Sequence, residues 1–432
     1  MNKRTLAAAL LCLALLCGCT PLNLSTEDLM RPPQLSENQS QVYNALMAAL
    51  GTSASNVSLR YPRSGDNRSA FIFHDLDGDG QDEAMVFYSL AGADDDLYVN
   101  IMEQGQSGWY STCDTPGAGS GVESVAFGSV SANDSRDILI GWAEDNSTVG
   151  QLSVMRYQDN ALDTLYQGKY SRYTTADLDG DGTQELVLIT MSSSGGKPFA
   201  TLIQPDLNRL TAVSNLPFNV VMSSFTQLQA GAVGGGLQGI VVDGYDGQDF
   251  VSEVFLVQDG RLTLPFASGS DFYDQVTRKD GPVASRDVDG DGVLELPVQT
   301  QAPGGSGDTK YYYTVYSHLN ADLTLTAVRQ AYVSTEQSYT LFLPEGWLEN
   351  VAVAATQGGE TTFTDHSESA AGGGRILLRI RVYSEKDYQD KFDTDRYQKI
   401  GQRGNFLYYA SVETGSDLSI TQSQLAQLFE LN

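Results

Sequence analysis

Three short stretches of the sequence concentrate carboxylates at a fixed spacing. Each follows the pattern Asp-x-Asp-x-Asp-Gly-x-x-Glu, with acidic residues at positions one, three, five and nine and glycine at position six. The acidic residues are Asp75, Asp77, Asp79 and Glu83 in the first stretch, Asp177, Asp179, Asp181 and Glu185 in the second, and Asp287, Asp289, Asp291 and Glu295 in the third. Alternate side chains of a tight loop can point toward one centre, so the spacing predicts that four carboxylates converge in each stretch.

Converging carboxylates need a cation. Two like charges about 4 Å apart repel by roughly 4 kcal/mol at an effective dielectric near 20, so a loop without a cation would be pushed open. Hard oxygen ligands in this number suit Ca²⁺, whereas Mg²⁺ demands a stricter octahedral geometry. A backbone carbonyl at position seven would complete each ligand set, from Gln81, Thr183 and Val293. We therefore expect three calcium sites, each of which pins the turn between the last strand of one sheet and the first strand of the next.

An EF-hand is the main competing interpretation of these loops. It requires an acidic residue at position twelve and flanking helices, but position twelve is Val86, Leu188 or Val298, inside apolar, strand-like segments. An exposed Asp-Gly turn that binds nothing is the simpler alternative. The apolar continuation favours loops that lead into β-strands.

The acidic loops belong to a longer repeat that predicts a mainly β chain. Four strand-like runs recur between Gly, Asp and Asn turns in each repeat, as a propeller blade requires. Repeats begin near Asp75, Ser129, Asp177, Gln227 and Asp287. We favour a β-propeller of five blades over an open array or another blade number. The fifth repeat lacks a fourth strand, and we expect residues 70–77 to supply it and close the ring.

The loop motif resembles that of the FG-GAP/VCBS repeats of integrin-α-type propellers, whose loops carry D-x-D-x-D-G-x-x-[DE]. The resemblance covers residues 69–335 and implies a calcium-bearing propeller. Two repeats depart from the motif. In the second, Ser129, Ser131 and Asn133 replace the aspartates although Asp137 stays in register, and the fourth repeat has no acidic residue there. We expect no calcium in these two.

The order of segments is similar to that of Gram-positive gut-bacterial VCBS-repeat lipoproteins, a resemblance that names no activity. Residues 16–19 resemble a lipobox, in which Cys19 would be lipidated after removal of the signal peptide. Serine and glutamine with capping-box spacing predict a helix after Ser36, and the chain ends in a second predicted helix. The predicted segments are a lipoprotein signal peptide at 1–18, a tether at 19–35, an N-terminal helix and lead-in at 36–68, the propeller at 69–335 and a small α+β domain at 336–432.

The charge and cysteine content of the chain limit which partners the protein can be expected to bind. The chain has 54 acidic and 26 basic residues and a net charge of −28, which argues against nucleic acid as a partner. Beyond Cys19 the only cysteine is Cys113, so an acylated Cys19 leaves no intramolecular disulfide. We expect an exported protein that is lipid-anchored to the outer face of the bacterial cell membrane and contacts the membrane through this lipid alone.

Signatures of catalysis are weak in this sequence. Residues 234–239 satisfy Gly-x-Gly-x-x-Gly, but a strand-like segment follows them where a dinucleotide-binding site needs a helix, so a glycine-rich turn between strands is the better interpretation. The chain has three histidines and neither a nucleophile-elbow motif nor a zinc-type Cys/His spacing. Paired carboxylates for polysaccharide chemistry are harder to dismiss, because acidic residues are abundant.

Aromatic residues offer a possible ligand face, with Trp109, Trp142 and Tyr312 as candidates, although Trp and Tyr are also ordinary strand residues. We favour a non-catalytic binding or adhesion module for an extracellular protein or glycan. The alternatives are a calcium-dependent polysaccharide-active enzyme, either a lyase or a hydrolase, and an extracytoplasmic sensor or assembly component.

Overall fold

The computed structural model describes residues 35–432 except 93–96, 133, 135, 193–194, 208, 267–268, 270, 305–309, 357, 368–373 and 387–395. The predicted signal peptide, Cys19, the tether up to residue 34 and Asn133 lie outside the described residues. No helix in the described part of the chain is long and apolar enough to span a bilayer.

Antiparallel sheets of four or five strands make up most of the described chain, and the first three follow in sequence order. The first sheet contains β1 (Val57–Leu59), β2 (Phe71–His74), β3 (Glu83–Leu90), β4 (Leu97–Gly105) and β5 (Gly108–Pro116). The second contains β6 (Gly121–Gly128), β7 (Asp137–Ala143), β8 (Gly150–Gln158) and β9 (Ala161–Tyr170). The third contains β10 (Arg172–Ala176), β11 (Glu185–Thr190), β12 (Phe199–Asp206) and β13 (Arg209–Pro217).

Three further sheets complete the chain. The fourth contains β14 (Ser224–Gly234), β15 (Leu237–Tyr245), β16 (Phe250–Gln258), β17 (Arg261–Thr263) and β18 (Arg278–Lys279). The fifth contains β19 (Leu296–Gln301), β20 (Tyr312–Leu319), β21 (Leu325–Ser334), β22 (Tyr339–Phe342) and β28 (Phe429–Leu431). The sixth contains β23 (Val351–Ala355), β24 (Glu360–Asp365), β25 (Arg375–Ser384), β26 (Gln398–Arg403) and β27 (Phe406–Val412).

Helices are few and short in the described chain. They are α3 (Glu37–Leu50), the 3₁₀ turn η1 (Ala54–Asn56), α4 (Asp271–Thr277), α5 (Trp347–Asn350) and α6 (Gln422–Leu428). Ser36 caps α3 through the predicted capping box with Gln39, and the apolar face of α3 buries Val42 and Leu46 against the first sheet. Both predicted helices, α3 and α6, are confirmed.

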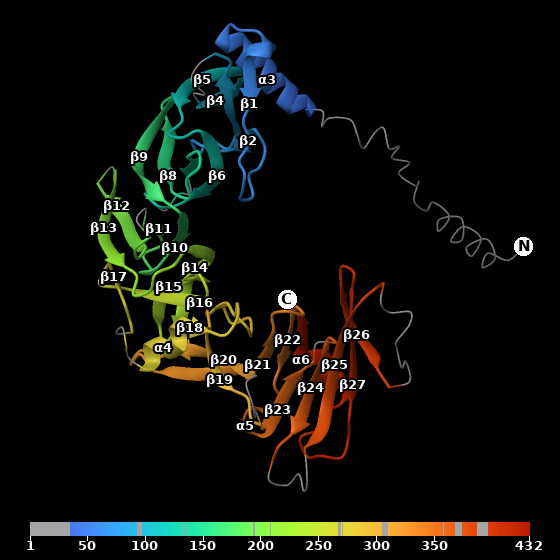
Figure 1. Ribbon diagram of the computed structural model, residues 1–432. Coiled ribbons are helices and arrows are strands. Elements are labelled where there is room, and N and C mark those ends of the chain that lie inside the picture. Colours follow the sequence, from blue (N-terminus) through green and yellow to red (C-terminus); the bar gives the residue numbers. More distant parts are fainter. Residues whose placement is uncertain are drawn as a thin grey trace, which may run out of the picture.

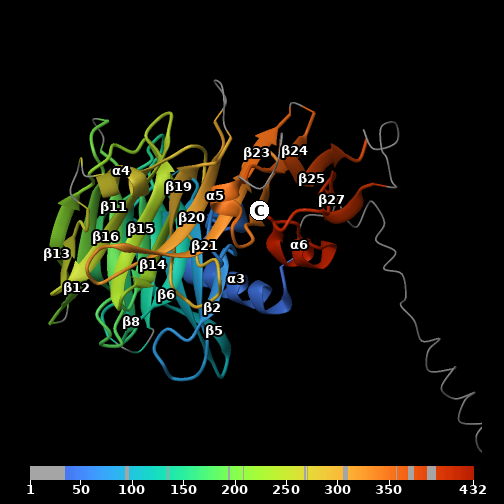
Figure 2. The same ribbon diagram turned by 90° about the horizontal axis from the view of Figure 1, so that it is seen from below.

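The first five sheets follow one another in chain order around an open arc (Figure 1). Consecutive sheets share apolar cores: Phe87 and Trp142 join the first two sheets, and Leu152 and Leu188 join the second and third. Because each inner strand is covered on both faces, β3 and β11 read as continuous apolar runs rather than alternating ones. Figure 2 places the sixth sheet and α6 beside this stack.

The predicted fold class is confirmed: the protein is mainly β, with blade-like sheets of the β-propeller type, a short N-terminal helix and a C-terminal segment of strands and helices. The predicted closure of the ring is wrong. Strand β2 pairs with β3 of its own sheet, and β22 supplies the fourth strand of the fifth sheet. A short hairpin loses less chain entropy than a contact between the two ends of the repeat region, which explains the local pairing.

Candidate metal-binding loops

The first two acidic loops lie inside one sheet each, and the third lies just before the first strand of the fifth sheet. Two loops join β2 to β3 and β10 to β11, and the third precedes β19. Position nine pairs with the residue just before position one in all three loops: His74 with Glu83, Ala176 with Glu185, and Arg286 with Glu295. The expectation that these loops connect one sheet to the next is therefore wrong for the first two, because the strands before and after each of them belong to one sheet. The third loop follows β18 of the fourth sheet and leads into β19 of the fifth.

The backbone of the first loop holds its carboxylates in place. The Asp75 carboxylate accepts hydrogen bonds from the amides of Gly78 and Gly80, at 2.8 and 3.1 Å. Both glycines have positive φ, near +83° and +87°, which glycine adopts without a steric penalty. The glycine at position four is thus as necessary as the predicted one at position six. The same bonds recur in the other loops, from Gly180 and Gly182 to Asp177 and from Gly290 and Gly292 to Asp287.

Carboxylates converge in all three loops, but not in equal number. Oxygen atoms that could bind one ion lie within 4.8 Å of one another in Asp75, Asp77 and Glu83, in Asp177, Asp179 and Glu185, and in Asp287, Asp289, Asp291 and Glu295. Position five joins the group only in the third loop. In all three loops the position-five carboxylate accepts the amide hydrogen of position seven, so this bond does not distinguish Asp291 from Asp79 and Asp181.

The residues predicted to supply carbonyl ligands are held by hydrogen bonds to the carboxylate at position five. The amides of Gln81, Thr183 and Val293 donate to the position-five carboxylates at 2.8, 2.6 and 2.8 Å. Their place in the loop is therefore fixed by backbone hydrogen bonds. A role of their carbonyl oxygens as ligands stays a prediction.

The position-nine glutamates carry the largest electrostatic cost in the loops. Glu83, Glu185 and Glu295 are 3, 2 and 0 % exposed, and each accepts one backbone amide at 2.7 Å. Burial raises the pKa of Glu83 to about 7, and the neighbouring aspartates of its loop raise it further while the Leu76 amide opposes the shift. Burial likewise raises the pKa of Glu185 and Glu295. A bound cation would offset the cost of ionising these buried groups.

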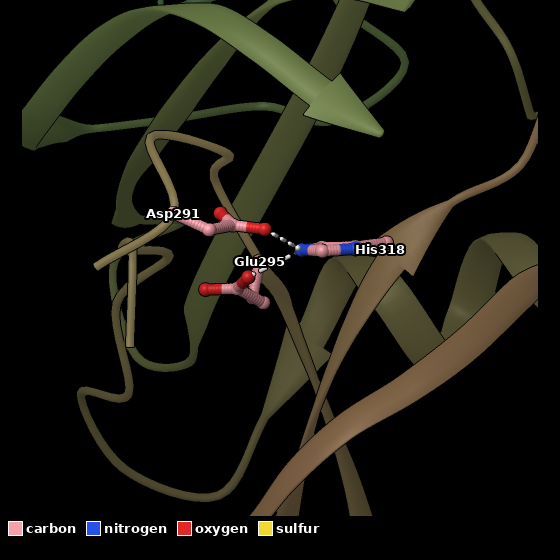
Figure 3. A group of neighbouring side chains, drawn as sticks. All are labelled: Asp291, Glu295 and His318. Atoms are coloured by element: carbon pink, nitrogen blue, oxygen red, sulfur yellow. Dashed lines mark hydrogen bonds and ion pairs between the residues drawn. The ribbon is translucent and has the colours of Figure 1, made fainter. Parts of the chain in front are cut away.

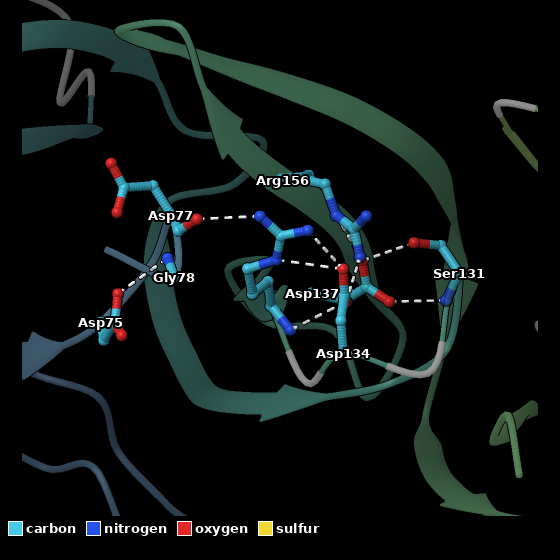
Figure 4. Close-up of polar contacts among 8 residues, drawn as sticks. Asp75, Asp77, Gly78, Ser131, Asp134, Asp137 and Arg156 are labelled. Carbon is cyan, nitrogen blue, oxygen red and sulfur yellow. Dashed lines mark hydrogen bonds and ion pairs between the residues drawn. The ribbon is translucent and has the colours of Figure 1, made fainter. Parts of the chain in front are cut away.

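In the second sheet, an arginine meets the carboxylate at position nine. Asp137, fully buried at this position, pairs across the sheet with Arg156, whose guanidinium lies 2.8 Å from Asp137 and 2.8 Å from Asp134 (Figure 4). The amide and hydroxyl of Ser131 also donate to Asp137. The positive charge that the aspartate-rich loops lack is supplied here by a side chain.

Neighbouring turns are linked into a row at one end of the stack of sheets. The Arg136 guanidinium donates to the Asp77 carbonyl at 2.8 Å, which links the first two loops. The Gln184 amide donates to the Ser129 carbonyl at 2.9 Å, which links the second and third. In the fourth sheet, the turn between β14 and β15 consists of Gly235 and Gly236, both with positive φ. The interpretation of this glycine-rich segment as a turn between strands is confirmed.

The third acidic loop has a histidine beside it. His318 on β20 places its Nε2 atom 2.6 Å from the Glu295 carboxylate and 3.7 Å from that of Asp291 (Figure 3). Sequence reasoning missed both His318 and Arg156, because each lies on a different strand from its loop. Register between the strand after each loop and the next strand of its sheet is the signal that could have found them.

The three candidate aromatic residues do not form one face. Trp142 is 1 % exposed and belongs to the core between the first two sheets, so its proposed place on a ligand face is wrong. Burial on both faces of β7 leaves no room for an exposed ring. Trp109 donates its indole hydrogen to Asn38 of α3 at 3.0 Å. Tyr312 lines a cavity of about 410 Å³ between the fifth and sixth sheets.

Comparisons with known proteins add no function. No family model and no curated protein matches the chain. Similar solved structures include the exotype rhamnogalacturonan lyase YesX (12 % identity, 70 % of this chain and 61 % of that one, TM-score 0.26) and the β-propeller domain of the Trilobed protease from Pyrococcus furiosus (10 %, 77 % and 90 %, 0.27). The Dos1 propeller is a third, with 10 % identity over 79 % of this chain and 81 % of that one and a TM-score of 0.28. This chain spans less than two thirds of the length of the lyase. Structural similarity at TM-scores this low gives no evidence about the function of this protein.

Proposed function

We propose that this protein is a calcium-binding β-propeller that is lipid-anchored outside the bacterial cell and binds an extracellular protein or glycan without catalysis. The observation that carries the calcium assignment is the repetition of one loop geometry at three places. Each copy gathers carboxylates within 4.8 Å around a buried glutamate. Export and the lipid on Cys19 rest on the sequence alone.

The second sheet supports a cationic occupant for the other three loops. Its loop lacks the aspartates at positions one, three and five, and Arg156 meets the buried Asp137 there. Where the aspartates are present at the first, third and fifth sheets, no described arginine or lysine forms an ion pair with the loop. Oxygen donors in this number and at this spacing suit Ca²⁺.

The candidate ligand site is the cavity beside Tyr312. Its lining combines aromatic rings with charged and amide groups: Tyr311, Tyr312, Lys310, Gln299, Asp280 and Glu336. Rings that stack on a sugar, with polar groups at their edges, are what recognition of a glycan requires. Calcium at the fifth-sheet loop would stiffen one of the two sheets that form this cavity.

A glycan array with the calcium-loaded, full-length protein tests this function. We expect binding of a small set of glycans without turnover, and we expect Tyr312→Ala to reduce it at least about tenfold. Tyr110→Ala is the matched control, because Tyr110 is 48 % exposed on the first sheet, away from the cavity. Release of new reducing ends or unsaturated products would instead favour the alternative of a polysaccharide-active enzyme. Binding that is equally weakened by both variants would contradict the assignment of this cavity.

A further inference from the structure

One position, on the strand that pairs with the strand after each loop, differs among the sheets in an informative way. It is the residue that faces position nine across the sheet. In the second sheet this residue is Arg156, opposite Asp137. The registers of β3 with β4 and of β11 with β12 place Glu103 and Gln204 opposite the first and third sheets' glutamates. In the fifth sheet it is His318, opposite Glu295.

The contacts of His318 join it to the carboxylate group. Its Nε2 atom lies 2.6 Å from Glu295 Oε1 and 3.7 Å from Asp291 Oδ2 (Figure 3). The three residues together could hold one metal ion, and Asp287 and Asp289 lie in an overlapping group. Metal–ligand bonds near 2.1 Å place neighbouring ligand atoms roughly 3 to 3.5 Å apart. An ion could therefore enter between His318 and the two carboxylates with only small side-chain movements.

A second observation makes this position a place for a cation. The equivalent residue of the second sheet, Arg156, puts a positive charge against the buried carboxylate at position nine. The same environment around Glu295, which is 0 % exposed, therefore favours a positive charge at this point in the sheet. His318 offers a ring nitrogen that could bind a cation where Arg156 supplies the positive charge itself.

We propose that the fifth-sheet loop is a mixed nitrogen and oxygen site that binds Zn²⁺ in preference to Ca²⁺, with His318, Asp291 and Glu295 as ligands. Imidazole nitrogen is a common ligand of zinc, whereas calcium takes oxygen ligands. The first- and third-sheet groups offer oxygen alone. The inference rests on the proposed function only in that the acidic loops bind divalent ions.

Competition between the two metals tests this assignment. The full chain is stripped of metal, saturated with Ca²⁺ and titrated with Zn²⁺ while released calcium is measured. Co²⁺, whose visible absorption reports nitrogen ligation, serves as a second probe. We expect Zn²⁺ to release one calcium ion of three at low concentration. His318→Gln, which places the third sheet's residue in the fifth, should raise the zinc concentration needed at least about tenfold and leave the calcium count unchanged.

His366→Gln is the matched control, because it removes a histidine of the sixth-sheet region and should leave the zinc titration unchanged. Zinc release of calcium that is the same in the wild type and His318→Gln would overturn the inference. An equal rise, in His318→Gln and His366→Gln, of the zinc concentration needed to release calcium would also overturn it. A protein that binds three calcium ions but releases none to zinc would refute this inference and leave the calcium function intact. A protein that binds zinc through His318 but binds no calcium would support this inference and contradict the calcium function.

Discussion

Removal of the Arg156 guanidinium should destabilise the protein more than removal of any exposed arginine. Arg156→Met leaves Asp137, which is 0 % exposed, without the guanidinium that lies 2.8 Å away. Loss of one partner of a buried ion pair costs about 3 to 5 kcal/mol. Arg156 is itself 18 % exposed, and Ser131 still donates to Asp137, so we expect a loss near the lower end of that range in the free energy of unfolding.

Urea denaturation of the calcium-loaded protein measures this loss. Arg209→Met, at an exposed position on β13, is the matched control and should change stability by less than about 0.5 kcal/mol. The double variant Asp137→Asn, Arg156→Met removes both charges and should recover at least about half of the loss. If Arg156→Met costs no more than Arg209→Met, the guanidinium does not take the role that we assign to a metal ion elsewhere, and the comparison between the second sheet and the acidic loops fails.

Three further predictions concern the metal loops, pH and the core. Replacement of Asp77, Asp179 or Asp289 by alanine should lower by one the number of calcium ions bound per chain, as counted by equilibrium dialysis. An unchanged number would contradict the ligand assignment. Burial raises the pKa of Glu253 to about 7, so the native state holds a proton that the unfolded state loses, and stability should fall as pH rises from about 4.5 to about 7. Glu253→Gln should remove up to about 3 kcal/mol of this fall, measured by urea unfolding at pH 5 and pH 8; equal slopes in both proteins would refute it. The Trp347 ring is fully buried, and its indole donates to the Leu418 carbonyl at 2.9 Å. Trp347→Ala should therefore lower the free energy of unfolding by about 3 to 5 kcal/mol in the same assay. A loss below about 1 kcal/mol would contradict its role in the C-terminal core.

The acidic loops could be predicted from sequence because their structure is local. Nine consecutive residues contain the carboxylates, the glycines with positive φ and the start of the next strand. The repeated strands could be predicted for the same reason, since the second and third sheets are built entirely from hairpins that are close in sequence. The pairing of β22 with the distant β28 in the fifth sheet is an exception. The place of the first two loops inside a sheet could not be predicted, because spacing alone does not say whether a strand pairs with the one before or the one after it.

Features that depend on contacts between distant segments could not be predicted correctly from the sequence. Closure of the ring requires knowledge of how each sheet is rotated on its neighbour, and that rotation is set by side-chain packing between sheets. The burial of Trp142 follows from cover on both faces of β7, which a single strand's sequence does not reveal. The contacts of Arg156 and His318 can be inferred only when the register of β7 with β8 and of β19 with β20 is known.

The number of calcium ions bound by the metal-stripped full-length protein tests the central claim most directly. Equilibrium dialysis with radioactive calcium, in buffer free of transition metals, counts the ions without any assumption about ligand or partner. The geometry of the three acidic loops predicts three ions per chain. Binding of no calcium at millimolar concentration would contradict the claim that these carboxylates are gathered to hold a cation.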